Sequence, residues 1–161
     1  MNHAPLTPSP SRARRKSRGQ SLVEMALVLP MFLMLICGVV DFSHVMFVEM
    51  TIQNALRQAG RFATTGNHLP DANGNAQSRV ASIVETAQQA APGFNFGAIN
   101  ISSANGGAGS AGGPGDIVTI SMSSSVPMLT PIIAPFFTNG AYNFTVSVTF
   151  KNEPFLPGQT T

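Results

Sequence analysis

The sequence predicts an α+β protein in which a long N-terminal transmembrane helix extends into a small exported domain. Three observations predict this fold: a charge-poor apolar run behind a basic cluster, a helical period that continues past that run, and alternating strand patterns towards the C-terminus. We expect a basic cytoplasmic leader at 1–19, a transmembrane and extended amphipathic helix at 20–66, and an exported α+β domain at 67–161.

Composition and charge agree with an anchored protein. The chain has 161 residues, enough for one modest domain and an anchor, and only 10% are charged while 43% are hydrophobic. Five of the nine basic residues precede Gly19, so the remaining four face seven acidic residues and the rest of the chain is net acidic. We therefore expect no nucleic-acid surface, and we interpret the basic cluster as a cytoplasmic tag in front of a membrane segment.

The segment Leu22–Val40 is predicted to span the bilayer, because its length is close to the ~20 residues that a spanning helix needs. The basic cluster places the N-terminus in the cytoplasm and the chain beyond Asp41 outside. A secretory signal would require a small-x-small cleavage site directly after the apolar run, and the sequence has none there. We expect the segment to be retained as a single-pass anchor in contact with the lipid bilayer.

Glu24 is the exceptional residue of this segment, because a carboxylate near lipid is costly unless it is paired. Cleavage after Gly19 would create an α-ammonium group on Gln20, and this group could neutralise Glu24 of a neighbouring copy. The hypothesis makes Gly19 and Gln20 a processing site and Glu24 a subunit charge-pairing residue. The alternative is an uncleaved signal-anchor with Glu24 at the level of the headgroups.

The helical period continues beyond the span. Apolar residues recur at three- and four-residue steps from Val45 to Ala63, and Gly66 ends the pattern. A helix over 20–66 would rise roughly 70 Å at 1.5 Å per residue, about twice the hydrocarbon thickness of a bilayer. Its second half therefore has an apolar stripe to bury against its own domain or against other subunits.

Three stretches of this helix resemble the TadE-type minor pseudopilins of the tight-adherence (Flp/Tad) pilus system. They are GQSLVEMALVLP at 19–30, GVVDF at 38–42 and ALRQAGRFATTG at 55–66. The resemblance implies cleavage by a prepilin peptidase between Gly19 and Gln20. It also implies, as partners, other Flp/Tad pilins and pseudopilins and an inner-membrane assembly platform.

The exported part contains one further helix and three strand signals. A turn-rich linker at 67–75 precedes a predicted helix at 76–91, which Pro92 and Gly93 end. Alternating patterns predict strands around 99–101, 118–122 and 142–151, with a flexible glycine-rich loop at 106–115 between the first two. We expect a roughly three-stranded antiparallel sheet that is covered on one face by the helix.

The apolar stretch 127–137 contains three prolines, which exclude a regular helix or a central strand. One interpretation is a connection that packs over the open face of the sheet. The other is an exposed interface for another pilus subunit, with Ile132 and Phe136 in contact.

Reactive groups are few. The three histidines are far apart in the sequence, the single cysteine, Cys37, lies inside the predicted span, and no serine has the context of a nucleophile. Asp71, Asn73 and Asn75 resemble the start of a calcium loop, but the later positions fail, so we interpret them as a turn. We predict a structural protein, not an enzyme, without cofactor, metal or catalytic residues.

The expected function is that of a minor pseudopilin or assembly factor for Flp/Tad-type pili, which serve adherence and biofilm formation. We expect it in the bacterial inner membrane, with a periplasmic or extracellular C-terminal domain, or incorporated in the pilus. One alternative is an uncleaved, membrane-anchored periplasmic binding module. Another is a pseudopilin of a type II secretion system, which the Ala/Arg-rich end of the first helix fits less well.

Overall fold

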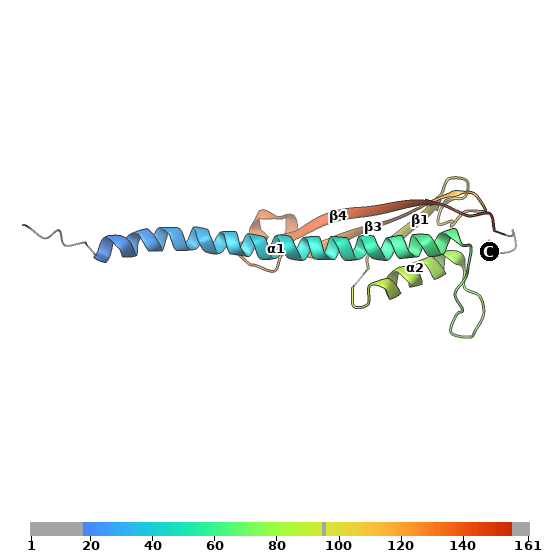
Figure 1. The fold of residues 1–161 in the computed structure, drawn as a ribbon, viewed down its shortest axis with the longest axis horizontal. Helices are drawn as coiled ribbons and strands as arrows, with labels where there is room; N and C mark the ends of the chain where they lie inside the picture. Colours follow the sequence, from blue (N-terminus) through green and yellow to red (C-terminus); the bar gives the residue numbers. More distant parts are fainter. Residues whose placement is uncertain (1–17, 95, 156–161) are drawn as a thin grey trace, which may run out of the picture. The chain divides into compact units, whose positions relative to one another are not determined.

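The computed structural model describes residues 18–94 and 96–155, so most of the predicted leader lies outside the described residues. The chain divides into two compact units, residues 1–36 and residues 37–161. The first described element is α1, Arg18–Thr64, which crosses both ranges (Figure 1). The second half of this helix therefore belongs to the same compact unit as the sheet, which we call the C-terminal unit.

Helix α1 confirms the predicted long N-terminal helix, and the described helix ends two residues before Gly66. Pro30 lies within the helix without ending it. Two hydroxyl groups donate hydrogen bonds to carbonyl groups of the last turn. Thr64 Oγ1 donates to the Arg61 carbonyl at 2.8 Å, and Thr65 Oγ1 donates to the Phe62 carbonyl at 2.7 Å. Gly66 follows with φ 71°, a backbone angle that glycine adopts readily.

Helix α2, Arg79–Ala90, begins three residues later than predicted. The side chain of Ser78 caps it by accepting a hydrogen bond from the Ala81 amide at 3.2 Å. Ala76, the predicted first residue, instead pairs with Pro70 in an isolated β-bridge. The apolar periodicity was therefore a good guide to the helix, and the capping serine sets its first residue.

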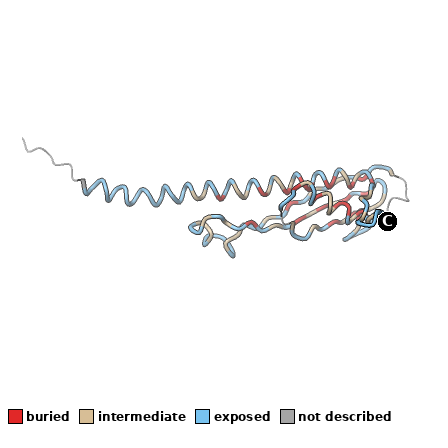
Figure 2. Tube along the Cα trace, turned by 90° about the horizontal axis from the view of Figure 1, so that it is seen from below, coloured by how far each residue is buried: buried red, intermediate tan, exposed pale blue. Residues whose placement is uncertain are grey.

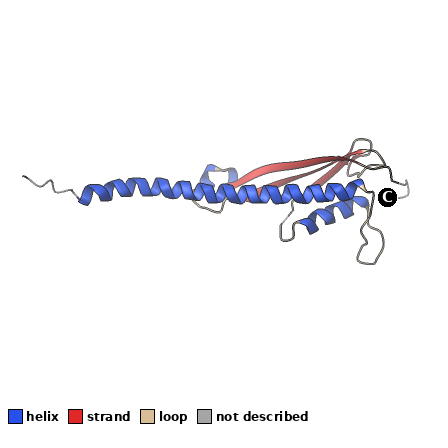
Figure 3. Ribbon diagram, viewed as in Figure 1, coloured by secondary structure: helices blue, strands red, loops and turns tan. Residues whose placement is uncertain are grey.

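The sheet has four antiparallel strands in the order β2-β1-β3-β4. Its long strands are drawn in red in Figure 3, and the helices in blue. They are β1 Ile99–Ser103, β2 Gly107–Ala108, β3 Ile117–Pro127 and β4 Ala141–Lys151. The three predicted strands are confirmed. The short β2 was not predicted, because its residues lie in the glycine-rich stretch that we interpreted as a flexible loop. Gly107 and Gly109, with φ 73° and 76°, let the chain turn back and pair with β1.

The two faces of the sheet differ in polarity, as the alternation predicts. Ile101, Ile120 and Val148 are register partners across β1, β3 and β4, and they belong to the apolar face. The opposite face carries hydroxyl side chains, among which Thr119 bonds Thr149 at 3.1 Å and Ser123 bonds Thr145 at 2.9 Å. This face remains polar and needs no cover.

The hydrophobic core lies between the apolar face of the sheet and the two helices (Figure 2). Helix α1 contributes Ile52 and Leu56, and α2 contributes Ile83; each is at most 2% exposed. Gly60 lets the ring of Phe150 rest directly on α1, because a Cβ atom at this position would lie 1.8 Å from Phe150 Cε2. The apolar stripe predicted on the second half of the helix is thus a structural part of the domain.

The connection between β3 and β4, residues 128–140, is called the β3–β4 loop below. It contains two short 3₁₀ helices, Ala134–Phe136 and Thr138–Gly140, which fit a stretch where prolines prevent longer helices. It closes with Asn139 and Gly140 in the left-handed region, at φ 56° and 67°. The Met128 amide then bonds the Gly140 carbonyl at 2.9 Å, which brings the ends of the loop together.

Candidate functional site

The predicted processing site lies in the first turn of α1. Gly19 and Gln20 are both exposed, and nothing lies within 4 Å of a Cβ atom built on Gly19. Larger side chains can therefore be placed at position 19 without a clash among the described residues.

Glu24 follows Gln20 by four residues, so the two lie on the same face of the helix about 6 Å apart along its axis. The side chain of Glu24 is exposed. Among the described residues it forms no ion pair, and the residues that follow it up to Cys37 are uncharged. The carboxylate is thus available to a partner from another molecule.

The first part of α1 exposes apolar side chains all around the helix. Leu22, Leu27 and Met31 are 71%, 70% and 76% exposed, and none of the described apolar residues between 22 and 36 is buried. Within the described residues, α1 is the one helix long and apolar enough to cross a membrane. It is a candidate membrane anchor, and the predicted span Leu22–Val40 lies in it.

Asp41 directly follows this span and is only 2% exposed. Its carboxylate holds the start of the β3–β4 loop. Oδ1 accepts hydrogen bonds from the backbone amides of Leu129, at 2.7 Å, and Thr130, at 3.2 Å, and Oδ2 accepts one from the Thr130 hydroxyl. One acidic side chain thus fixes the loop to α1 at the first residue after the predicted span.

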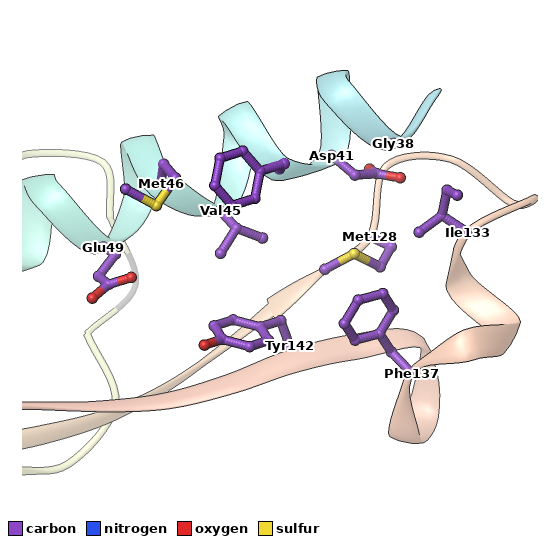
Figure 4. A pocket seen from close by; sticks show the side chains of 10 residues that line it. Gly38, Asp41, Val45, Met46, Glu49, Met128, Ile133, Phe137 and Tyr142 are labelled. Carbon is purple, nitrogen blue, oxygen red and sulfur yellow. The ribbon is translucent and has the colours of Figure 1, made fainter. Parts of the chain in front are cut away.

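A groove beside Asp41 separates α1 from the loop, with a volume of about 380 Å³. Figure 4 shows side chains of the helix facing side chains of the loop and of β4 across it. Its lining is mostly apolar and includes Val45, Met46, Met128, Phe137 and Tyr142. We call it the Asp41 groove. Such an apolar groove next to a candidate span is a place where lipid, a partner helix or a small apolar ligand could bind.

The predicted interface residues are exposed. Ile132 is 46% exposed and Phe136 is 73% exposed, so neither side chain packs over the open face of the sheet. The β3–β4 loop instead lies against α1 through Asp41. The structure leaves these two apolar side chains available for contact.

Metal and catalytic chemistry have little support among the described residues. No group of three metal-ligating side chains occurs there. The loop that resembles a calcium site is a turn, as interpreted, in which Asp71 Oδ1 accepts the amides of Asn73 and Asn75, both at 2.8 Å. Asp116, buried like Asp41, bonds Asn105 and the Ile117 amide and so serves the fold.

The comparisons with known proteins agree with the helix described above. Residues 19–61 match the family model of the TadE-like proteins. The resemblance predicted from the sequence is confirmed, and this TadE-like segment runs from the predicted processing site to the last turn of α1. No curated protein and no solved structure gives a significant match.

The match is consistent with a TadE-like protein of the Tad pilus system, and it suggests other pilus components as partners. The TadE-like family is not known as a family of enzymes. The matched segment contains Glu24, Asp41 and most of the residues that α1 contributes to the hydrophobic core. The β3–β4 loop lies outside it.

Two residues of structural importance were missed from the sequence. Asp41 served to mark the end of the predicted span, and Arg79, only 3% exposed, was not singled out at all. Their partners are distant in sequence: Asp41 bonds Thr130, and Arg79 bonds the carbonyls of Ala63 and Gly112. The prolines of the β3–β4 loop indicated that this stretch forms no regular helix or central strand, but they did not indicate its contact with Asp41.

Replacing Asp41 with alanine is expected to loosen the β3–β4 loop, because two backbone amides and a hydroxyl group lose their acceptor. Hydrogen–deuterium exchange of the full chain in detergent should show faster exchange at Leu129 and Thr130. Ser43→Ala is the matched control, since Ser43 bonds the Val39 carbonyl and not the loop. Equal exchange in both variants would contradict this assignment.

The same contact predicts a pH dependence. The Thr130 hydroxyl and the backbone amides of Leu129 and Thr130 hold the pKa of Asp41 below its ordinary value of 3.8, although burial opposes them. Stabilisation by the ionised carboxylate is therefore fully present above about pH 3.8 and is lost as the pH falls through the lowered pKa. Loop protection in the wild-type chain should fall in that acidic range, and the alanine variant should not show this step.

Proposed function

We propose that this chain is a minor pseudopilin or assembly factor of Flp/Tad-type pili, anchored in the bacterial inner membrane. Its N-terminus lies in the cytoplasm and its C-terminal unit in the periplasm or outside the cell. A prepilin peptidase removes the leader between Gly19 and Gln20, and the mature protein takes part in building pili for adherence and biofilm formation. The inner-membrane assembly platform and the other Flp/Tad pilins and pseudopilins are its partners.

The observation that carries the proposal is the coincidence of three features in one helix. The TadE-like match begins at Gly19, Glu24 stands five residues later, and the following residues expose apolar side chains on every side. An ionised carboxylate in an apolar helix favours a cationic partner, because a charge in contact with lipid is costly unless it is paired. The new ammonium group on Gln20 of a neighbouring subunit supplies such a partner.

Processing is tested by the N-terminus of the mature protein. In cells that carry the pilus machinery we expect a chain that begins at Gln20, and we expect Gly19→Val to retain the leader. A Cβ atom built on Gly19 has no atom of the described residues within 4 Å, so the variant reports on cleavage and not on folding. Gly38→Val, a substitution in the same helix where a Cβ atom also has nothing within 4 Å, should be cleaved normally. A wild-type chain that begins at Met1 would contradict the proposal.

The second candidate is an uncleaved, membrane-anchored binding module, and the Asp41 groove of about 380 Å³ is the observation that favours it. The same N-terminal measurement separates the two functions. The intact leader would favour the binding module.

A further inference from the structure

We propose that the β3–β4 loop is a second membrane contact, which rests in the lipid interface beside the point where α1 leaves the bilayer. The occupant of this exposed apolar surface is the bilayer itself. The inference rests on the membrane anchor of the proposed function, but it does not depend on cleavage or on pilus assembly.

The first step is the depth of the loop. Leu129 and Thr130 donate backbone hydrogen bonds to the Asp41 carboxylate, so their amides lie within about one hydrogen-bond length of that side chain. Asp41 comes one residue after Val40, the last residue of the proposed span, and one residue of helix rises about 1.5 Å. Chain connectivity alone therefore puts the start of the loop at the boundary between hydrocarbon and headgroups.

The second step is the surface that the loop presents at this depth. Leu129, Ile132 and Phe136 are 57%, 46% and 73% exposed. No charged residue occurs between Asp116 and Lys151, so no ionised group of the loop has to be dehydrated when it enters the interface. Tyr142, at the start of β4, adds an aromatic ring with a polar end, a side chain enriched at membrane interfaces.

The third step is continuity with the span. Val39, Val40 and Phe42 are also exposed, at 58%, 47% and 67%. The exposed apolar surface of α1 thus extends to Asp41, the residue that the loop contacts. The apolar side chains of the loop enlarge this surface at the depth of Asp41. Lipid reaches this surface in every inserted copy, before any other subunit arrives. The exposed apolar side chains of the loop have a competing explanation, which is a contact site for another subunit, as predicted for Ile132 and Phe136. The experiment must distinguish this site from a lipid contact.

Single-cysteine labelling tests the inference on the full chain, because Cys37 is its only cysteine. In a Cys37→Ser background, Phe136→Cys and Leu129→Cys each place an environment-sensitive fluorophore on the loop. Ala108→Cys is the matched control: it is exposed and lies near the other end of the sheet, since Ser102 pairs with both Ala108 and Thr119. The wild-type protein labelled at Cys37 reports on the span.

The labelled proteins are reconstituted into phosphatidylcholine–phosphatidylglycerol vesicles at no more than one copy per vesicle. Some of the lipids carry a nitroxide quencher at a shallow position of the acyl chain. We expect the labels at positions 136 and 129 to lose most of their emission, as the label at Cys37 does, while the label at position 108 keeps its emission.

Three results would overturn the inference. Emission at positions 136 and 129 equal to that at 108, with Cys37 quenched, would place the loop in water and leave the anchor intact. Shielding of position 136 only in crowded vesicles, or only after addition of another pilin, would identify a subunit interface. An unquenched label at Cys37 would reject the membrane anchor itself, and with it the second contact.

Discussion

Replacing Arg79 with methionine is expected to destabilise the C-terminal unit by about 2–4 kcal/mol, because each buried polar group left without a partner costs about 1–3 kcal/mol. Arg79 is 3% exposed and lies in the first turn of α2. Its Nη2 donates to the Ala63 carbonyl at 2.9 Å, and its Nη1 donates to the Gly112 carbonyl. Methionine fills a similar volume but satisfies neither carbonyl group.

The position of Arg79 adds two further contributions. Ala63 is in the last turn of α1, where the helix macrodipole favours a positive charge. The guanidinium carbon also lies 4.7 Å from the ring centroid of Phe155, a cation–π contact. Burial lowers the pKa of Arg79, but arginine stays protonated at all relevant pH values. The charge is therefore present and is held by carbonyl groups and an aromatic ring.

Pulse proteolysis of the full chain in mild detergent, across a urea series, measures this loss of stability. The control is Arg61→Met, at an exposed arginine in the last turn of α1, and its expected effect is within about 0.5 kcal/mol. Arg79→Lys should fall between the two, because a single ammonium group does not reproduce the fork of the guanidinium. Equal urea midpoints for Arg79→Met and Arg61→Met would refute the assigned role.

Replacing Glu24 with glutamine is expected to reduce the amount of major pilin that co-purifies with this protein roughly tenfold or more. A tenfold loss of affinity corresponds to about 1.4 kcal/mol of binding free energy. Glutamine keeps the size of the side chain but removes the charge and replaces one acceptor oxygen with an NH2 donor. The proposed partner, the ammonium group on Gln20 of a neighbouring subunit, then loses its counter-charge. Membrane insertion should not suffer, because an uncharged side chain enters the bilayer more easily.

Glu49→Gln is the matched control for this measurement. Glu49 lies on the same helix but in the C-terminal unit, where it accepts a hydrogen bond from Gln53 at 3.2 Å. We expect this variant to co-purify as the wild type does. Normal co-purification and normal pili with Glu24→Gln would reject the charge pairing. Glu24 would then need another role, even if the chain is cleaved before Gln20.

The sequence predicted the elements of this fold well, because their signals are local. The apolar steps from Val45 to Ala63 predicted the buried side of α1, and the alternation of β4 predicted the strand that packs against it. The bounds of α2 were less accurate, because the pairing of Ala76 with Pro70 competes with the helix and Ser78 caps it. β2 was not predicted, because its two residues, glycine and alanine, have side chains too small to show an alternating pattern.

The candidate site divides in the same way. Gly19, Gln20, Glu24 and the apolar run are neighbours in sequence, so a pattern could single them out, and the TadE-like match covers them. The Asp41 groove could not be predicted, because it depends on the contact of Asp41 with Leu129 and Thr130 across most of the chain. An aspartate on the polar side of a helix is ordinary until its distant partner is known.

The TadE-like segment supplies Val48, Ile52, Leu56 and Ala59 to the hydrophobic core, and this limits how the molecule can be dissected. A fragment that starts after α1 would carry the apolar side of the sheet without Ile52 and Leu56, and it would expose that side to water. A chimera that grafts residues 67–161 onto another helix would need glycine at the position of Gly60, because a Cβ atom there would lie 1.8 Å from Phe150 Cε2. Useful fragments should therefore begin near Cys37, where the compact unit itself begins.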